Sequence, residues 1–195
     1  MDLAATHGHL DIVKYLHKTR TEGCTFKAMT MAAGNGHLDI VEWLHANRTD
    51  GFSAFAFTLA AGNGHLDVIQ WLCENSKEVP SQFAMDEAAS NGQLEVIQWL
   101  HENRTEGCTA RAIDMAAANG HLDVVEWLVT HRTEGFTYAA IDGAAKNGHL
   151  EVVRFLMQQQ AGSVSARTVR QAAIQGHLNV LEFLIGEGVQ PDLEL

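Results

Sequence analysis

Six histidines occupy the same place in a recurring Gly-His pair, and imidazole at a regular spacing first suggests metal binding or proton transfer. They are His9, His37, His65, His121, His149 and His177. A metal ion requires its ligand atoms within about 2 Å of one point. If each histidine belongs to its own packed helical unit, successive rings lie about 10 Å apart. We therefore predict no metal site and a structural role for these imidazoles.

Three carboxylates, Asp86, Asp114 and Asp142, also share one place at the same spacing. Two carboxyl groups could perform general acid catalysis if they came within about 5–10 Å of each other. Neighbouring units could just allow that distance, but we favour hydrogen bonds that tie adjacent units together or hold the next loop. The sequence has no glycine-rich phosphate loop, no HExxH and no GxSxG motif. We expect no enzymatic activity and no cofactor.

Composition restricts the partners and the compartment. The 195 residues carry a formal charge of −11, and their 13 Lys and Arg residues form no basic stripe, which argues against nucleic acid and anionic membranes as partners. The sequence lacks a run of about 18 apolar residues, the length that a membrane-spanning helix needs. The three cysteines, Cys24, Cys73 and Cys108, are odd in number, which suits a reducing compartment. We expect a cytoplasmic monomer.

The elements that position these residues come from a repeat. The segment GHLDIVEWLH, residues 36–45, has close counterparts that start at 8, 64, 92, 120, 148 and 176, so every interval is 28 residues. A unit this short cannot bury its own apolar face and must stack on its neighbours. We predict one domain, 1–195, with an incomplete first unit. The unit ranges are 1–24, 25–52, 53–80, 81–108, 109–136, 137–164 and 165–195.

Each unit predicts two helices. A Ser or Thr such as Thr25 opens the unit, and its hydroxyl can cap the first helix. That helix ends near an Asn-Gly pair such as 35–36, where a left-handed residue turns the chain. The second helix starts at His-Leu-Asp or a close variant. It carries an aromatic residue at one shared place, which we interpret as a ladder of core aromatics: Tyr15, Trp43, Trp71, Trp99, Trp127, Phe155 and Phe183.

The first helices have one uniform face and one variable face. Counted from the cap, positions 3, 4, 7 and 8 are apolar except for Thr168, which suits close packing. Periodicity predicts that positions 2, 6 and 9 face solvent, and these differ between units. Ten of them are our candidates for partner binding: Lys27, Met31, Phe55, Leu59, Phe83, Glu87, Arg111, Met115, Lys146 and Arg167. Aromatic, Met and Arg side chains are typical interface anchors, although Phe55 and Phe83 could equally pack under the adjoining loops.

The segment KAMTMAAGNGHLDIVEWLH, residues 27–45, resembles the ankyrin repeat, whose pattern reads TPLHxAAxxGHxxVVxxLL. The Ala-Ala, the Gly-His and the Val/Ile pair match it in type and spacing. The resemblance implies an all-α solenoid of about seven stacked, antiparallel helix pairs with a concave face that binds partner proteins. The period of 28 is shorter than the family's, which is about 33 residues. The missing residues fall in the family's β-hairpin finger, so we expect these fingers to be absent or vestigial.

Two hypotheses for the function follow. The first is a non-catalytic scaffold that binds a partner protein on the concave face of the solenoid. The second is a structural spacer, a fragment of a longer array of repeats with no binding site of its own. The second hypothesis is motivated by the first unit, which begins inside its first helix.

Overall fold

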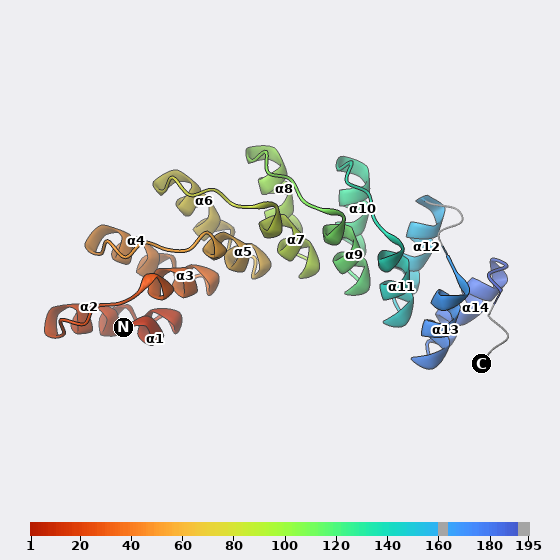
Figure 1. Ribbon diagram of the computed structural model, residues 1–195, viewed down its shortest axis with the longest axis horizontal. Helices are drawn as coiled ribbons and strands as arrows, with labels where there is room; N and C mark the ends of the chain where they lie inside the picture. The colour runs from red at the N-terminus through yellow and green to blue at the C-terminus, as the bar shows by residue number, and fades with distance from the viewer. Residues whose placement is uncertain (160–163, 191–195) are drawn as a thin grey trace. The chain divides into compact units, whose positions relative to one another are not determined.

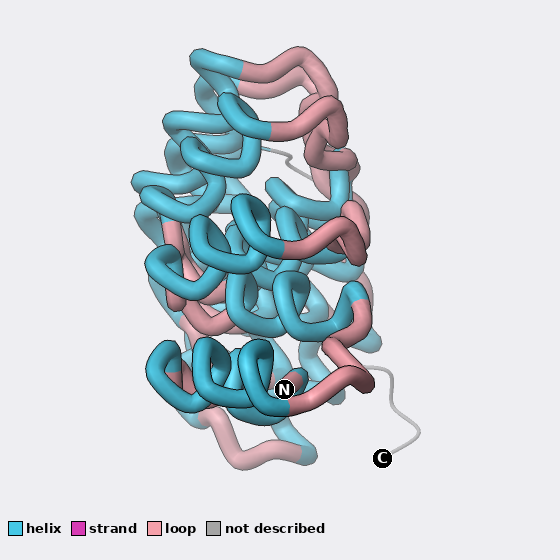
Figure 2. Tube along the Cα trace, turned by 90° about the vertical axis from the view of Figure 1, so that its left-hand side faces the viewer, coloured by secondary structure: helices cyan, strands magenta, loops and turns pink. Residues whose placement is uncertain are grey.

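The chain folds into helices joined by turns and loops, as a computed structural model shows for residues 1–159 and 164–190. These ranges contain fourteen α-helices and no β-strand (Figures 1 and 2). Odd-numbered helices are the first helices of their repeats and even-numbered helices are the second. The helices are α1 (Asp2–Thr6), α2 (Leu10–Thr19), α3 (Phe26–Gly34), α4 (Leu38–Asn47), α5 (Phe55–Gly62), α6 (Leu66–Asn75), α7 (Gln82–Ser90), α8 (Leu94–Asn103), α9 (Ala110–Ala118), α10 (Leu122–His131), α11 (Tyr138–Lys146), α12 (Leu150–Gln159), α13 (Ala166–Ile174) and α14 (Leu178–Gly186).

These helices confirm the predicted all-α class built from repeated helix pairs. Each even-numbered helix begins 28 residues after the preceding even-numbered helix, from Leu10 in α2 to Leu178 in α14. Where the structure describes them, the connectors that follow the second helices, such as 48–53, are loops without strands. In the part of the chain that the structure describes, no helix is long and apolar enough to cross a bilayer.

The chain divides into two compact units, which are described separately. Unit 1 comprises 1–88 and 95–107, and unit 2 comprises 89–94 and 108–195. Within unit 1, α3 packs between α1 and α5, and within unit 2, α11 packs between α9 and α13. The single domain that the repeat predicts stays a prediction. The predicted unit boundary at 164 adjoins residues outside the described part of the chain, and the predicted end at 195 lies outside it.

The uniform face of the first helices forms the core of each unit. In unit 1, the side chains at positions 3, 4, 7 and 8 of α3 are at most 3% exposed: Ala28, Met29, Ala32 and Ala33. In unit 2, the corresponding side chains of α9 are at most 2% exposed: Ala112, Ile113, Ala116 and Ala117. The second helices add Ile, Val and Leu side chains such as Ile40 and Leu44. This burial confirms the predicted apolar face. Its alanines let neighbouring first helices approach closely.

Local hydrogen bonds define both ends of the first helices. At the end of α3, Gly36 has φ +76°, His37 N donates to Ala32 O at 2.9 Å, and Gly36 N donates to Ala33 O at 3.2 Å. This is the bond pattern of a helix end closed by a left-handed glycine. At the start of α3, the Thr25 hydroxyl accepts a hydrogen bond from Lys27 N at 3.2 Å. Both features confirm the predicted turn and cap.

The aromatic residues of the second helices are less enclosed than we predict from the sequence. The four tryptophans are half-buried. In unit 1, the Trp43 ring meets His17 edge-on at 5.1 Å between centroids, and Trp71 meets His45 in the same way at 5.2 Å. Each histidine comes from the preceding second helix. Trp43 and Trp71 therefore join repeats at the rim of the core, because the small side chains of the first helices fill its centre. In unit 2, the Trp127 ring stacks on His131 of its own helix at 4.4 Å between centroids.

Candidate functional site

The histidines of the Gly-His pairs pack across repeat boundaries. In unit 1, the His65 ring covers Gly36 so closely that a Cβ added to the glycine would lie 2.5 Å from Nδ1. In unit 2, the His149 ring covers Gly120 with the same 2.5 Å approach. Burial is the main cause that lowers the pKa of both histidines, so the folded chain favours their neutral form. Their role is structural, and the described residues hold no group of three or more His, Cys, Asp or Glu placed to bind a metal.

The aspartates that share one register bind the start of the following repeat. In unit 2, the Asp114 carboxylate accepts hydrogen bonds from Thr137 N at 2.8 Å and from Thr137 Oγ1 at 2.7 Å. The Asp142 carboxylate accepts a hydrogen bond from Thr168 Oγ1 and lies 3.5 Å from Arg167 Nε. These contacts confirm that hydrogen bonds tie adjacent repeats together. They occupy the carboxylates that we weighed as a general acid pair.

Unit 1 uses the same kind of contact. The Asp2 carboxylate accepts hydrogen bonds from Thr25 N at 3.0 Å and from Thr25 Oγ1 at 2.6 Å. Where threonine replaces the aspartate, one bond is kept, because Thr30 Oγ1 accepts from Ser53 N at 3.0 Å. Asp86 in the same register is only 1% exposed. The register therefore links a first helix to the cap or the first turn of the next one.

The loops carry a second inter-repeat contact, made by an arginine and an acid two residues later. In unit 1, Arg48 Nε donates to Asp50 Oδ2 at 2.8 Å, and the guanidinium lies against Gly23 of the preceding loop. Asp50 also accepts a hydrogen bond from Cys24 Sγ at 3.5 Å. Burial, followed by the nearby Asp50 charge, raises the pKa of the Cys24 thiol. This cysteine therefore stays protonated near neutral pH and is a poor nucleophile.

The same pairing recurs in other loops of both units. Arg104 Nη2 donates to Glu106 Oε1 at 2.7 Å in unit 1, and Arg132 pairs with Glu134 in unit 2. The hydrogen bond from the guanidinium is the main cause that lowers the pKa of both glutamates. The charged groups of these loops are thus paired with each other.

The variable face of unit 1 carries large exposed apolar side chains. Phe55 and Phe83 stand at position 2 of α5 and α7, and each is 55% exposed, so neither is packed away under a loop. Lys27 takes the same position in α3 and is exposed. Met31 is 37% exposed. Bulky groups held on successive helices offer a preformed contact surface.

Two other candidates of unit 1 are partly used for packing. Leu59 and Glu87 are half-buried at position 6 of their helices. Leu59 covers Gly34, because a Cβ added to that glycine would lie 2.8 Å from Leu59 Cβ. Gly34 at position 9 is consequently buried, and Gly62 at the same position of α5 is buried as well. The expectation that position 9 faces solvent is therefore wrong for these two helices, and in α3 the cause is Leu59 at position 6 of the next repeat.

The variable face of unit 2 is chemically different. Arg111, Lys146 and Arg167 are exposed, whereas Met115 is half-buried. The first helix between the two arginines, α11, contributes small residues at positions 2 and 6, Ala139 and Gly143. This face is cationic rather than aromatic.

Position 1 of the first helices holds residues that we do not predict as contacts. Phe26 is 48% exposed in unit 1, and Tyr138 is 68% exposed in unit 2. Each aromatic directly follows the threonine cap, at a position that is Ala or Gln in the other complete repeats. A bulky residue at a position that is otherwise small or polar is the sequence signal that identifies them.

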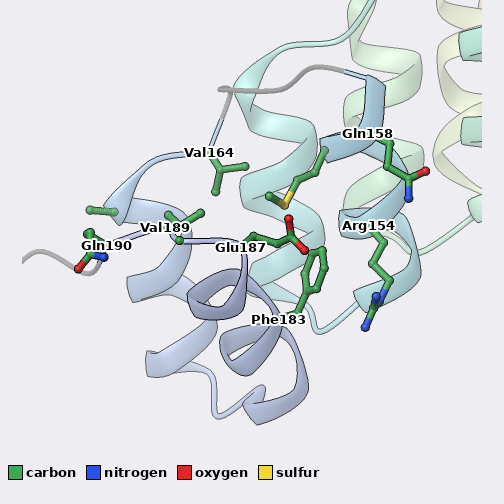
Figure 3. A pocket seen from close by; sticks show the side chains of 10 residues that line it. Arg154, Gln158, Val164, Phe183, Glu187, Val189 and Gln190 are labelled. Atoms are coloured by element: carbon green, nitrogen blue, oxygen red, sulfur yellow. The ribbon is translucent and has the colours of Figure 1, made fainter.

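Unit 2 also contains a cavity of about 720 Å³, shown in Figure 3. Its lining comes from α12, α14 and the segments next to them, and includes Arg154, Met157, Phe183 and Glu187. The Arg154 guanidinium carbon lies 4.4 Å from the centroid of the Phe183 ring. The Arg154 cation is therefore stacked on an aromatic face. Among the described lining residues, we identify no arrangement of side chains that would bind an anion.

Comparison with protein families gives a match along nearly the whole chain. The family model described as "Ankyrin repeats (3 copies)" matches residues 1–83, 29–114, 57–139, 85–165 and 113–194. Successive matches start 28 residues apart, as the repeat does. A search of curated proteins finds no match.

Proposed function

The chain belongs to the ankyrin-repeat family, and on that basis we propose that it is a non-catalytic scaffold that binds a partner protein on the variable face of its first helices. This is the concave face expected of an ankyrin stack. Repeats of this family generally mediate protein–protein interaction and are typically non-catalytic. The observation that carries the proposal is the pair Phe55 and Phe83, which are each 55% exposed at the same position of successive first helices.

The energy available from this pair is large enough to matter for binding. An aromatic side chain buries roughly 200 Å² when it is fully enclosed, so the exposed half of each ring offers about 100 Å². At about 25 cal/mol per Å², covering both rings contributes about 5 kcal/mol before the cost of association. The helices hold the two backbones in place, so little ordering of the chain is needed on binding.

The engagement of the polar groups supports the non-catalytic part of the proposal. The carboxylates of Asp114 and Asp142 bind the following repeat, and the His65 and His149 rings pack on glycines of the preceding one. Groups that serve the stack in this way are poorly placed to meet a substrate. On the variable face, residues such as Phe55 and Phe83 differ between repeats and remain exposed.

A capture experiment tests the proposal. The chain and the variant Phe55→Glu with Phe83→Glu are each immobilised, and proteins retained from a native lysate are cross-linked and identified by mass spectrometry. We expect the variant to lose the retained partner. Leu59 is left unchanged, because it covers Gly34 and its replacement would alter stability.

Tyr15→Glu is the matched control for this experiment. Tyr15 is 65% exposed on the second helix α2, so the change also replaces an exposed aromatic residue by an acid in unit 1. We expect its partner recovery to equal that of the unchanged chain. Equal recovery by the Phe55/Phe83 variant would instead favour the structural spacer.

We further propose that the chain is a cytoplasmic monomer. Cys24, Cys73 and Cys108 form no disulfide bond, which suits a reducing compartment. Light scattering during gel filtration should give a mass near 21.3 kDa. A mass of about twice that value would contradict the monomer.

A further inference from the structure

We propose that a second copy of this chain docks end to end on the first, with the α13/α14 end of one copy covering the α1/α2 end of the other. The inference goes beyond the proposed partner face, because it concerns the two ends of the repeat series. The N-terminal end face is made of Leu3, His9, Ile12 and Tyr15. The C-terminal end face is made of Ile174, Gly176, Leu178 and Ile185.

The N-terminal end face, in unit 1, exposes apolar side chains at positions that are closed elsewhere. Ile12 is 48% exposed. The residues in its register are at most 2% exposed: Ile40, Val68, Val96, Val124, Val152 and Val180. Leu3 and Tyr15 are 76% and 65% exposed, although every other aromatic residue in the register of Tyr15 is half-buried. This face is therefore one side of a repeat boundary without its cover.

The C-terminal end face, in unit 2, is open in the corresponding way. The His177 ring lies over Gly148 of the preceding repeat, with Nδ1 2.5 Å from an added Cβ, whereas no described residue comes within 4 Å of a Cβ added to Gly176. Three apolar side chains of the same face are at least 51% exposed: Ile174, Leu178 and Ile185. Among the described residues, this end lacks the cover that a following repeat supplies elsewhere.

Contacts between successive repeats show that the two end faces are complementary. In both units, a histidine lies over the glycine of the preceding repeat, as His37 does over Gly8. Continuing this register from one copy to the next places His9 of one copy over Gly176 of the other. His9 is exposed, and its ring stacks on His7 at 6.3 Å between centroids. A glycine without a ring and a ring without a glycine therefore stand at opposite ends of the chain.

The second helices fit in the same register. Within unit 1, Trp43 of one second helix meets His17 of the preceding one, with ring centroids 5.1 Å apart. The corresponding residues at the two ends are Tyr15 and Ile185, so Tyr15 of one copy packs on Ile185 of the other. Both side chains are more than half exposed in the single chain. Docking therefore removes apolar surface from water on each side.

The contact is weaker than a boundary within the chain. Leu59 packs over Gly34 of the preceding repeat, but the same register sets Leu3 of one copy against Ile174 of the other. Two large side chains hold the copies farther apart, and the few exposed apolar residues cover less than the area of about 800 Å² per partner that a stable complex buries. We expect a dissociation constant on the order of 0.1 mM, so the monomer proposed above predominates at about 5 µM.

Two variants that each block one end test the proposal. Leu3→Glu with Ile12→Glu places acids on the N-terminal end face, and Leu178→Glu with Ile185→Glu places acids on the C-terminal end face. An acid buried in the contact without a partner is costly. Because the contact joins unlike faces, a copy with either end blocked cannot pair with itself. A mixture of the two variants restores one intact contact, and the resulting pairs cannot grow further.

Sedimentation equilibrium at physiological ionic strength measures the mean mass. The mean mass of the unchanged chain should rise above 21.3 kDa as its concentration approaches about 1 mM, whereas each blocked variant alone should stay near that value. The mixture, at about 0.5 mM of each variant, should reach about 1.6 times the mass of the separate variants. Circular dichroism checks that the helices are kept, and Leu3→Glu alone is the milder variant of the first pair, since Leu3 is 76% exposed.

The matched control is Phe55→Glu with Phe83→Glu, which makes the same change in net charge at two exposed apolar residues away from both ends. Each copy carries a formal charge of −11, so this control also accounts for the added repulsion between copies. It should associate like the unchanged chain. Loss of association by the control, with association kept by the two end variants, would place the contact on the variable face and overturn the proposal.

Three further results would overturn it. The first is an unchanged chain that keeps its monomer mass at about 1 mM. The second is a mixture that is no heavier than its separate components, or self-association of the variant blocked at the C-terminal end, which indicates contact between like ends. The third is association by a chain that ends at residue 190 but not by the full chain, which would make residues 191–195 the occupant of the C-terminal end face. The capture experiment tests the proposed function independently of all of these outcomes.

Discussion

The Asp114 carboxylate accepts two hydrogen bonds from Thr137, one from the backbone nitrogen at 2.8 Å and one from Oγ1 at 2.7 Å. Thr137 Oγ1 in turn accepts a hydrogen bond from Ala139 N at 3.1 Å, the cap of α11. One carboxylate of α9 therefore orders the start of the next first helix. The stack is held by such contacts between residues 23 positions apart as well as by its apolar core.

Replacing that carboxylate should weaken the stack. Asp114→Ala leaves the Thr137 N–H and hydroxyl without their acceptor, so we expect the free energy of unfolding to fall by about 1–3 kcal/mol. Urea denaturation followed by circular dichroism measures the change. Glu126→Ala, at an exposed position of α10, is the control and should change stability by less than about 0.5 kcal/mol. Equal effects of the two substitutions would contradict the role of Asp114.

The close approach of Leu59 to Gly34 predicts a steric conflict that can be relieved. Gly34→Ala improves helix propensity by about 1 kcal/mol, but its Cβ would lie 2.8 Å from Leu59 Cβ. We expect a net loss of about 1–2 kcal/mol. Adding Leu59→Gly, which removes that Cβ, should cost less in the Gly34→Ala background than in the unchanged chain, which a double-mutant cycle measures.

Gly186 provides the control for this packing argument. It is also a helical glycine, but nothing lies within 4 Å of an added Cβ. Gly186→Ala should therefore be neutral or stabilising in the same denaturation experiment. Additive effects of Gly34→Ala and Leu59→Gly would show that the two residues do not compete for space.

The loop at Ser76 lacks the arginine that neighbouring loops of unit 1 carry, and restoring it should stabilise the chain. Ser76 stands at the place of Arg48, and Glu78 is already at the place of Asp50. The space over Gly51, where a guanidinium would lie, is open within 4 Å. We expect Ser76→Arg to raise the free energy of unfolding by about 0.5–1 kcal/mol. If Ser76→Arg with Glu78→Gln gave the same gain, the ion pair would not be its cause.

Stability should fall between neutral and mildly acidic pH because of the histidines at repeat boundaries. Burial is the main cause that lowers the pKa of His149, the charges of His121 and His177 add to it, and a hydrogen bond with the Ala118 backbone opposes it. The unfolded chain therefore binds the proton more readily than the folded chain. The stabilisation is complete above the unfolded pKa, about 6.5, and is lost as the pH falls from there towards the folded pKa.

His65 should act in the same direction, because burial lowers its pKa, with His37 adding to the effect and Asp67 opposing it. Urea denaturation at about pH 7.5 and about pH 5 measures the loss, above most of the carboxylate titration range. His149→Gln should reduce the difference in stability between the two pH values, and the native chain already carries Gln93 in this register. A pH dependence unchanged by His149→Gln would exclude this ring as a source.

Much of the fold could be read from the sequence because its determinants are local. The cap at Thr25 and the left-handed turn at Gly36 each depend on residues within a few positions of one another. The 28-residue period then places every helix. Alanines at fixed positions of the first helices identify the buried face without knowledge of their neighbours.

The candidate surface could be read only in part, because exposure depends on the neighbouring repeat. Periodicity treats Leu59 and Phe55 alike, yet Leu59 lies over Gly34 while Phe55 is 55% exposed. The partner of Asp114 is likewise a residue of the next repeat. The sequence by itself determined the helices, their order and the buried face, since these follow from interactions within one repeat. Only the tertiary structure decided which varied side chains remain free for a partner, since that depends on the size and position of residues in adjacent repeats.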